Sequence, residues 1–224
     1  MTQRYSLEPV IQESTPSIIA RKLRYAIAHG EVAPGSQLGE AELARELGVS
    51  RGPLREAMQR LTQEGLLVSI RNRGLFVIEM TDAEIRDMYV LRTAIESAAC
   101  KLLVRGDHVA AGQDLLDKVT EMENAAATDD RAALYDADIA FHEHLVAASG
   151  SPGLARIHGT VMTQTRMCLN VLPDSVRAGD EWIDEWIEEH RGIAQAVLTG
   201  NAVLAERRLN ERRGASDRGA DRAE

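Results

Sequence analysis

Three side chains in the C-terminal half of the chain have the types and the spacing of a metal site. Asp138 and His142 lie four residues apart in a segment with helical periodicity, so both project from the same face of that helix. His190 follows in a later helical segment. A carboxylate and two imidazoles that converge inside a helical bundle can hold a divalent metal such as zinc or nickel. Each histidine taken alone has a simpler interpretation, as a buried polar group satisfied by hydrogen bonds.

A second group of side chains, near the N-terminus, has the chemistry of DNA contact. Arg51 and Arg55 are four residues apart at the start of a helical segment, and each can pair with guanine O6 and N7 in a major groove. Ser50 precedes them and, with the amides of the first turn, can bind a phosphate. Gly52 has no side chain and so leaves room for close approach of the helix to DNA. The alternative for the two arginines is a solvated helix face.

A basic turn supplies further cationic groups for the same purpose. Arg71, Arg73 and Gly74 lie between two short runs with strand character, 66–70 and 75–78. A hairpin tip of this composition can enter the minor groove beside the recognition helix. The ordered combination of a helix pair, an arginine pair and a basic tip favours DNA binding over a solvated surface.

The elements that position the N-terminal group have the order of a winged helix-turn-helix. Apolar spacing predicts a helix from Pro16 to about Gly30, a short helix at 38–47 that ends at Gly48, and a third at 51–63. The hairpin follows. We therefore predict three helices and a small β-hairpin for residues 1–78, and a linker at 79–81.

From residue 82 the chain has helical periodicity almost throughout. Thr81 and Glu84 have the spacing of a capping box, which marks a helix start. Glycine, proline and aspartate breaks then divide the chain into six helices near 82–105, 108–127, 131–149, 152–171, 178–199 and 201–213. We predict an all-α antiparallel bundle for residues 82–213 and a disordered tail at 214–224, so the protein as a whole is mainly α.

Composition separates the two segments and limits the classes of protein. Residues 1–78 hold ten Arg and Lys against eight Asp and Glu, whereas residues 79–224 hold sixteen against twenty-seven. Such asymmetry indicates different tasks. No apolar run approaches the roughly 20 residues that span a bilayer. Cys100 and Cys168 lack CxxC spacing, which argues against a disulfide framework and favours a cytoplasmic protein.

The N-terminal segment resembles a known family. Residues 34–78, with Ser50-Arg51-Gly52-Pro53-Leu54-Arg55 at the start of the third helix, are similar to the winged helix of the GntR family of bacterial transcriptional regulators. Gly52 departs from the threonine usual in that family, which removes one hydroxyl that can contact phosphate. The resemblance implies that Ser50, Arg51, Arg55, Arg71, Arg73 and Gly74 contact DNA.

The C-terminal segment resembles the FCD effector domain of the FadR subfamily over residues 82–212. The similar segments are 92–96, 138–142 and 189–196. In metal-binding members an Asp, a His four residues later and two further His hold the ion, and Asp138, His142 and His190 match the first three. The last is expected at position 212, which is Arg212. A protonated guanidinium has no lone pair for a metal.

Two alternatives follow for the effector site. Either a divalent metal is held by three protein ligands and stays open to water and to the effector, or Arg212 replaces the charge of the metal. Guanidinium binds carboxylates bidentately, and this favours the second alternative slightly. Arg92 and Arg166 are further candidate anchors for an acid. His158 is available as an extra ligand, although its spacing does not argue for it.

These features together predict an effector-responsive transcription factor, most simply a repressor. It would bind a palindromic operator as a homodimer through residues 1–78 and a small organic acid through residues 82–212. A metal-dependent enzyme built on the helical domain is the first alternative, but no nucleophile or pair of catalytic carboxylates accompanies the Asp138 group. A helical protein-interaction module is the second.

Overall fold

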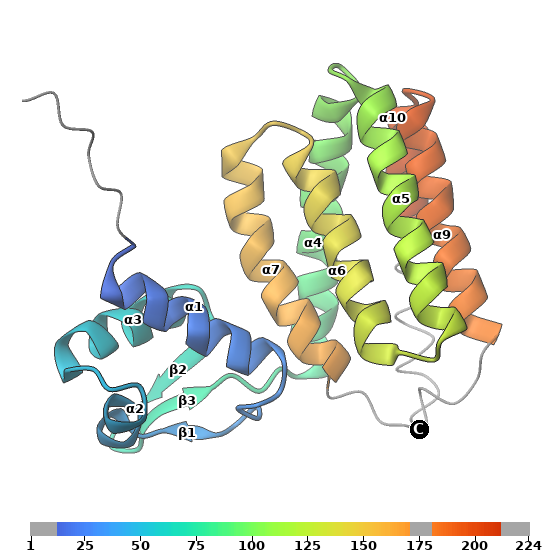
Figure 1. The fold of residues 1–224 in the computed structure, drawn as a ribbon. Coiled ribbons are helices and arrows are strands. Elements are labelled where there is room, and N and C mark those ends of the chain that lie inside the picture. The colour runs from blue at the N-terminus through green and yellow to red at the C-terminus, as the bar shows by residue number, and fades with distance from the viewer. Residues whose placement is uncertain (1–12, 171–180, 212–224) are drawn as a thin grey trace, which may run out of the picture. The chain divides into compact units, whose positions relative to one another are not determined.

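The computed structural model describes residues 13–170 and 181–211 and divides the chain into two compact units (Figure 1). One unit contains the described residues up to Ile27 together with 31–78. The other contains 28–30 and the described residues from 79 onward. The predicted tail at 214–224, the start of the helix predicted from 178, and Arg212 lie outside the described residues.

The N-terminal unit is a winged helix-turn-helix with a three-stranded sheet. Its elements, in chain order, are α1 (Thr15–Ala28), β1 (Gln37–Leu38), α2 (Glu40–Glu46), α3 (Arg51–Gln63), β2 (Leu67–Ile70) and β3 (Gly74–Val77). The strands are antiparallel in the order β1-β3-β2, with Phe76 opposite both Gln37 and Val68. The sequence predicted only the β2–β3 hairpin. A two-residue strand such as β1 is too short to show alternation, and its pairing with β3 defines it.

Helix α3 has one fully buried face and one exposed face. Leu54, Ala57, Met58 and Leu61 keep the helical spacing of three and four residues, and each is at most 4% exposed. This burial anchors the helix to the unit, and it leaves the polar residues of the first turn on the opposite, exposed side.

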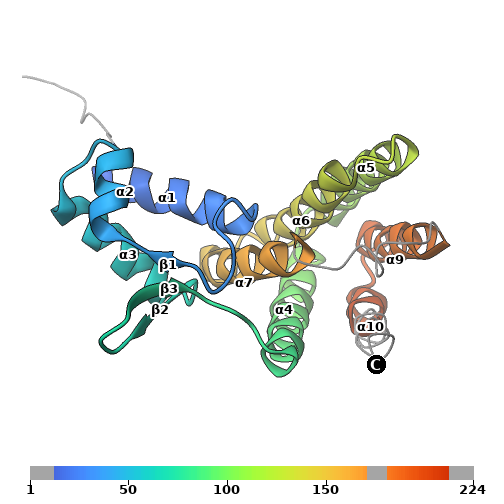
Figure 2. The same cartoon turned by 90° about the horizontal axis from the view of Figure 1, so that it is seen from below.

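The C-terminal unit is a bundle of helices that run up and down side by side (Figures 1 and 2). The described helices are α4 (Asp82–Leu103), α5 (His108–Ala127), α6 (Arg131–Ala147), α7 (Pro152–Asn170), α9 (Glu181–Leu198) and α10 (Ala202–Glu211). Their bounds agree closely with the predicted ranges. The capping box is present: the Thr81 hydroxyl accepts from the Glu84 amide, and the Glu84 carboxylate accepts from the Thr81 amide.

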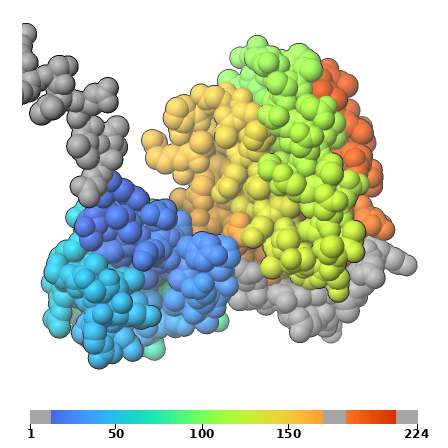
Figure 3. Space-filling view, viewed as in Figure 1, coloured from blue at the N-terminus to red at the C-terminus, as the bar shows by residue number. Residues whose placement is uncertain are grey.

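The bundle core lies between α5, α6 and α9, with α4 and α10 packed against it. Leu115 and Val119 of α5, Phe141 of α6, and Ile193 and Val197 of α9 are fully buried there. In the space-filling view, side chains of α5 and α6 fill the gaps between the ribbons on this face (Figure 3). The same helices that make the core, α6 and α9, carry the residues of the predicted metal group.

Helices α5 and α9 approach each other closely at Gly112. A Cβ atom at Gly112 would lie 2.4 Å from the Cα of Leu198, closer than side chains tolerate. The absence of a side chain at this position therefore sets the distance between the two helices.

Candidate functional site

The start of α3 presents the predicted DNA-contact residues to solvent. Ser50 is the N-cap residue of α3 and has an extended backbone conformation. Its hydroxyl makes no capping hydrogen bond. Arg51, Gly52 and Arg55 are all exposed. A Cβ at Gly52 would meet no atom within 4 Å, so this face of the first turn is open. The free hydroxyl, the first-turn amides and the positive helix end suit a phosphate.

Arg55 forms an ion pair with an acidic neighbour in its own unit. Its Nε lies 2.8 Å from a carboxylate oxygen of Glu40 at the start of α2, and its side chain remains 63% exposed. Exposed ion pairs of this kind contribute little to stability, so the pair is easily exchanged for another anionic or acceptor partner. Glu40 orients the guanidinium and does not block it.

The predicted basic tip is the turn between β2 and β3. Asn72 and Gly74 have positive φ angles of 61° and 105°, which lets the chain reverse within four residues. The Gln37 side-chain amide donates to the Arg73 carbonyl at 2.6 Å, and the Arg73 guanidinium lies 5.4 Å from the centre of the Phe76 ring. The structure thus places Arg71 and Arg73 on an exposed, braced tip, whereas Gly74 serves the backbone of the turn.

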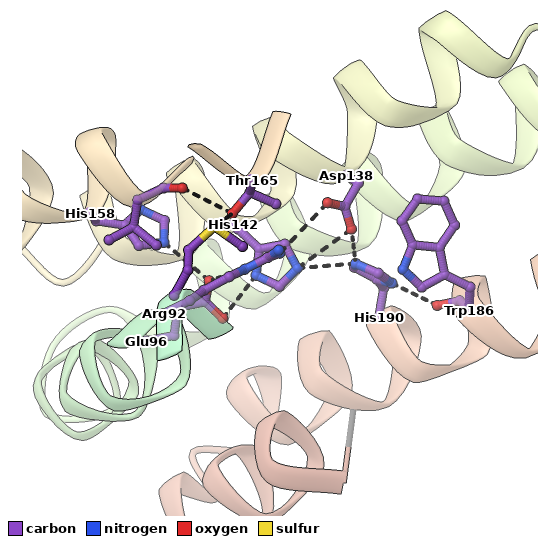
Figure 4. A network of polar contacts seen from close by, with 10 residues as sticks. Arg92, Glu96, Asp138, His142, His158, Thr165, Trp186 and His190 are labelled. Atoms are coloured by element: carbon purple, nitrogen blue, oxygen red, sulfur yellow. Dashed lines mark hydrogen bonds and ion pairs between the residues drawn. The ribbon is translucent and has the colours of Figure 1, made fainter. Parts of the chain in front are cut away.

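The predicted metal group converges inside the bundle. Asp138 and His142 lie on α6 and His190 on α9, and each is at most 1% exposed (Figure 4). His190 Nε2 lies 2.8 Å from Asp138 Oδ1 and 3.1 Å from His142 Nε2. His142 Nε2 lies 3.7 Å from the same Asp138 oxygen. One possible ligand atom from each of the three residues lies within 4.8 Å of the other two.

Two further residues of α4 surround this group. Glu96 Oε2 lies 3.0 Å from His142 Nδ1, and Arg92 Nε donates to Glu96 Oε1 at 2.9 Å. The Arg92 Nη2 atom lies 3.6 Å from Asp138 Oδ2 and is buried without a hydrogen-bond partner. The structure therefore brings Arg92 to the group, as the sequence predicted. Sequence reasoning did not assign a role to Glu96, although its spacing of four residues from Arg92 indicates an ion pair.

The surroundings of both carboxylates favour the ionised form. Burial by itself raises the pKa of Asp138, but the Arg92 charge and the facing imidazoles outweigh burial and hold the pKa well below its usual range. The pKa of Glu96 is lowered in the same way. Burial raises this pKa, but the combined effect of His142, Arg92 and His158 is larger and lowers it. Two negative charges thus face the single positive charge of Arg92.

The hydrogen-bond partners assign the ring nitrogens of the two histidines. His142 Nδ1 faces the Glu96 carboxylate, and His190 Nδ1 lies 2.6 Å from the Trp186 carbonyl oxygen. Both partners accept, so both Nδ1 atoms carry hydrogen, and in its neutral form each ring presents a lone pair at Nε2. Two lone pairs and a carboxylate oxygen that face each other need a positive charge among them, supplied by a metal ion or by a proton. The donor set fits a divalent metal, with outer partners that orient both imidazoles.

Other predicted residues lie apart from this group. Arg166 of α7 pairs with Asp136 of α6, and none of its hydrogen bonds or ion pairs described by the structure joins the Asp138 group. His158 of α7 is buried and lies 3.1 Å from Glu96 Oε1, so it contacts the outer carboxylate and not the three converging atoms. Arg212, the predicted replacement for the last ligand, lies outside the described residues.

Comparison with known protein families agrees with this architecture. Residues 17–77 match the family described as bacterial regulatory proteins, gntR family, and residues 87–212 match the FCD domain. The chain belongs to the GntR family of transcriptional regulators. It is a DNA-binding regulator with an FCD effector domain, not an enzyme.

Three relatives illustrate the family. The chain is 33% identical over 187 residues to an uncharacterised helix-turn-helix transcriptional regulator of Streptomyces ambofaciens, covering 82% of this chain and 75% of the relative. It is 28% identical to the probable D-xylose utilization operon repressor of Paenarthrobacter nicotinovorans (82% and 78% covered). It is 25% identical to the gluconate operon repressor of Bacillus subtilis (92% and 85% covered).

Among solved structures, a GntR regulator from Rhodococcus sp. RHA1, titled as putative, has the same fold. The superposition has a TM-score of 0.76 at 25% sequence identity, and it covers 93% of this chain and 99% of the Rhodococcus chain. The helices of the described residues include none with the length and apolar character of a membrane span.

Proposed function

We propose that this GntR regulator is a repressor that binds a palindromic operator as a homodimer, and that a small organic acid bound at a metal centre in the FCD unit controls it. The observation that carries the effector half of the proposal is the buried convergence of Asp138, His142 and His190 beside an incompletely bonded Arg92. A regulator that binds the chromosome works in the cytoplasm, where we place it.

The DNA-reading half rests on the exposed first turn of α3 and the β2–β3 tip. Arg51 and Arg55 enter the major groove, Ser50 and the helix amides bind a phosphate, and Arg71 and Arg73 contact the minor groove. An operator with two half-sites requires two such heads, which a two-fold symmetric dimer supplies. The net positive charge of residues 1–78 supports this assignment.

Asp138, His142 and His190 would hold the metal, and imidazole ligands suit zinc or nickel. When bound, a divalent cation offers positive charge and a coordination position that an effector carboxylate can occupy. The charges support this arrangement, because the two carboxylates of Asp138 and Glu96 outweigh the single positive charge of Arg92 and all three side chains are buried.

Arg92 is the proposed anchor for the acid. Its Nη2 is buried without a hydrogen-bond partner, and an unsatisfied buried donor is costly. A carboxylate is the partner that a guanidinium binds best. A gluconate operon repressor among the relatives is compatible with an organic acid as the effector class. Because α4 carries Arg92 and begins directly after the linker at 79–81, contacts with the acid act on the helix that leads to the DNA-binding unit.

Elemental analysis and calorimetry test the effector half. We expect purified protein to carry close to one zinc or nickel per chain, Asp138→Asn to lose it, and organic acids to bind more weakly after Arg92→Ala. If Arg212 supplies the charge instead, the wild type carries little metal, Arg212→Ala abolishes acid binding, and Arg212→His raises metal affinity. Metal-free wild type that binds no acid would refute the proposed effector site.

A further inference from the structure

The Glu96 carboxylate is held between three helices. Oε1 accepts from Arg92 Nε at 2.9 Å and lies 3.1 Å from His158 Nε2, while Oε2 lies 3.0 Å from His142 Nδ1. These groups come from α4, α7 and α6, and Figure 4 shows them in one continuous line of contacts. Each of the four side chains is at most 4% exposed. At this degree of burial, the three protein groups set the orientation of the carboxylate.

His158 fixes Glu96 from outside helix α4 and is not itself one of the three proposed metal ligands. Arg92 lies on α4 one turn before Glu96, so their bond does not tie the carboxylate to another helix. Arg92 is also directed toward Asp138 and, in the proposed function, toward the acid. Among the ion pairs of the described residues, His158 takes part in one, and its partner there is Glu96. An ionised carboxylate only accepts, so His158 donates through Nε2–H.

We propose that His158 is a positioning residue for the metal centre: by holding Glu96, it keeps the Nδ1–H of His142 engaged and Nε2 of His142 directed at Asp138 and His190. The inference rests on the proposed metal centre and adds a residue that the Asp-His-His pattern does not contain. The consequence is that a side chain of α7, which supplies none of the three ligand atoms, controls metal affinity. Outer partners that orient ligating imidazoles typically change metal affinity by about 10–100-fold.

The test measures zinc affinity by competition with a chelator and the visible absorption of the cobalt(II) form, both on the full-length protein. His158→Leu removes the donor with little change in volume, and we expect about 10–100-fold weaker zinc binding and an altered cobalt spectrum. His158→Gln places an amide nitrogen where Nε2 lies, and we expect affinity within about threefold of the wild type. This rescue separates the hydrogen bond from packing.

Thr165 provides a matched control on the same helix. It is fully buried, and its hydroxyl contacts the Val161 carbonyl oxygen and the Met88 sulfur but not Glu96. Thr165→Val should therefore leave zinc affinity and the cobalt spectrum unchanged. An equal loss in Thr165→Val and His158→Leu would overturn the proposal, because packing of α7 would then explain both.

The remaining outcomes separate the existence of the metal centre from the role of His158. A wild type that binds neither zinc nor cobalt overturns the metal centre and the role of His158 together. A folded His158→Leu variant with wild-type affinity and spectrum overturns the role of His158 alone. If His158→Leu does not fold, the pair His158→Gln and His158→Asn decides, since asparagine is too short to reach Glu96. Weaker binding only in the asparagine variant supports the proposal, and equal binding in both overturns it.

Discussion

Arg51 and Arg55 lie in the first two turns of α3 and are exposed, so a change of either side chain leaves the buried face of the helix intact. We expect Arg51→Ala and Arg55→Ala each to weaken operator binding by about 1–3 kcal/mol and to relax preference at one base pair per half-site. Arg105→Ala, an exposed charge change in the other unit, is the matched control. Fluorescence anisotropy on cognate and scrambled duplexes measures both effects. Wild-type affinity in both recognition-helix variants would contradict the assignment of α3.

The effector site shows how far residue patterns reach. The Asp138 and His142 pair was predictable because four-residue spacing places both side chains on the same helix face. His190 was predictable because it lies in the segment 189–196, which resembles the FCD domain. The roles of Glu96 and His158 were not, because they depend on the distance between α4 and α7 and on which carboxylate oxygen faces which helix. No spacing along the chain encodes such a contact between helices. Arg166 illustrates the same limit, since its pairing with Asp136 is set by packing of α7 on α6.

At the scale of elements, helix bounds followed from the sequence because caps and breaks are local. The Thr81–Glu84 box and the glycines that end helices act within one turn. Strand β1 was missed because its two residues become a strand only by pairing with β3. The packing distance between helices was likewise not predictable, and it depends on single small residues.

Gly112 sets the spacing of α5 against α9, and it provides a test of that packing. Gly112→Ala brings a methyl group against the backbone of Leu198, so we expect the free energy of unfolding to fall by about 1–3 kcal/mol. Gly159→Ala, in α7, meets no atom within 4 Å and should be neutral or stabilising by up to about 1 kcal/mol. Urea unfolding followed by circular dichroism measures both. Equal stability of the two variants would show that the helices separate without cost.

Helix α4 also buries a thiol whose chemistry reports on opening of the bundle. Burial raises the pKa of Cys100 to about 12, whereas an unfolded thiol ionises near pH 9. The folded state therefore binds more protons between these values, so this contribution to stability is complete below pH 9 and is lost as the pH rises toward 12. At pH 8 we expect iodoacetamide to modify Cys100 only in urea. Mass spectrometry of the native protein measures this, and rapid native labelling would contradict a closed bundle.

At the scale of the whole molecule, the uneven charge allows an acidic protein to bind DNA. The excess of Asp and Glu lies in residues 79–224 of the sequence, whereas residues 1–78, which carry the arginines of α3 and of the β2–β3 turn, hold more Arg and Lys than Asp and Glu. Phosphate contacts release counterions, so operator affinity should fall with added salt. Replacing Arg71 or Arg73 should make that dependence less steep, in contrast to replacing Arg51 or Arg55 of α3, which we propose to read bases.

Two-fold assembly is the remaining requirement for a regulator that reads two half-sites. Helix α4 exposes apolar side chains on the side away from Arg92 and Glu96: Leu91 is 50% exposed and Val90 is 38% exposed. We place part of the dimer contact there, because burial of apolar surface drives association. Light scattering should give twice the 24.6 kDa of the chain.

The variant Leu91→Glu tests this contact directly. A carboxylate buried in an interface without a partner is costly, so we expect the dissociation constant of the dimer to rise by at least about 100-fold. Val203→Glu, at a 78% exposed position on α10, adds the same charge to an apolar site outside the proposed contact and should remain dimeric. Operator affinity should fall with the dimer, since a single head contacts one half-site. A wild-type protein that is monomeric at micromolar concentration, both free and on DNA, would exclude two-fold recognition. A Leu91→Glu variant that remains dimeric would show that the dimer contact lies on another surface.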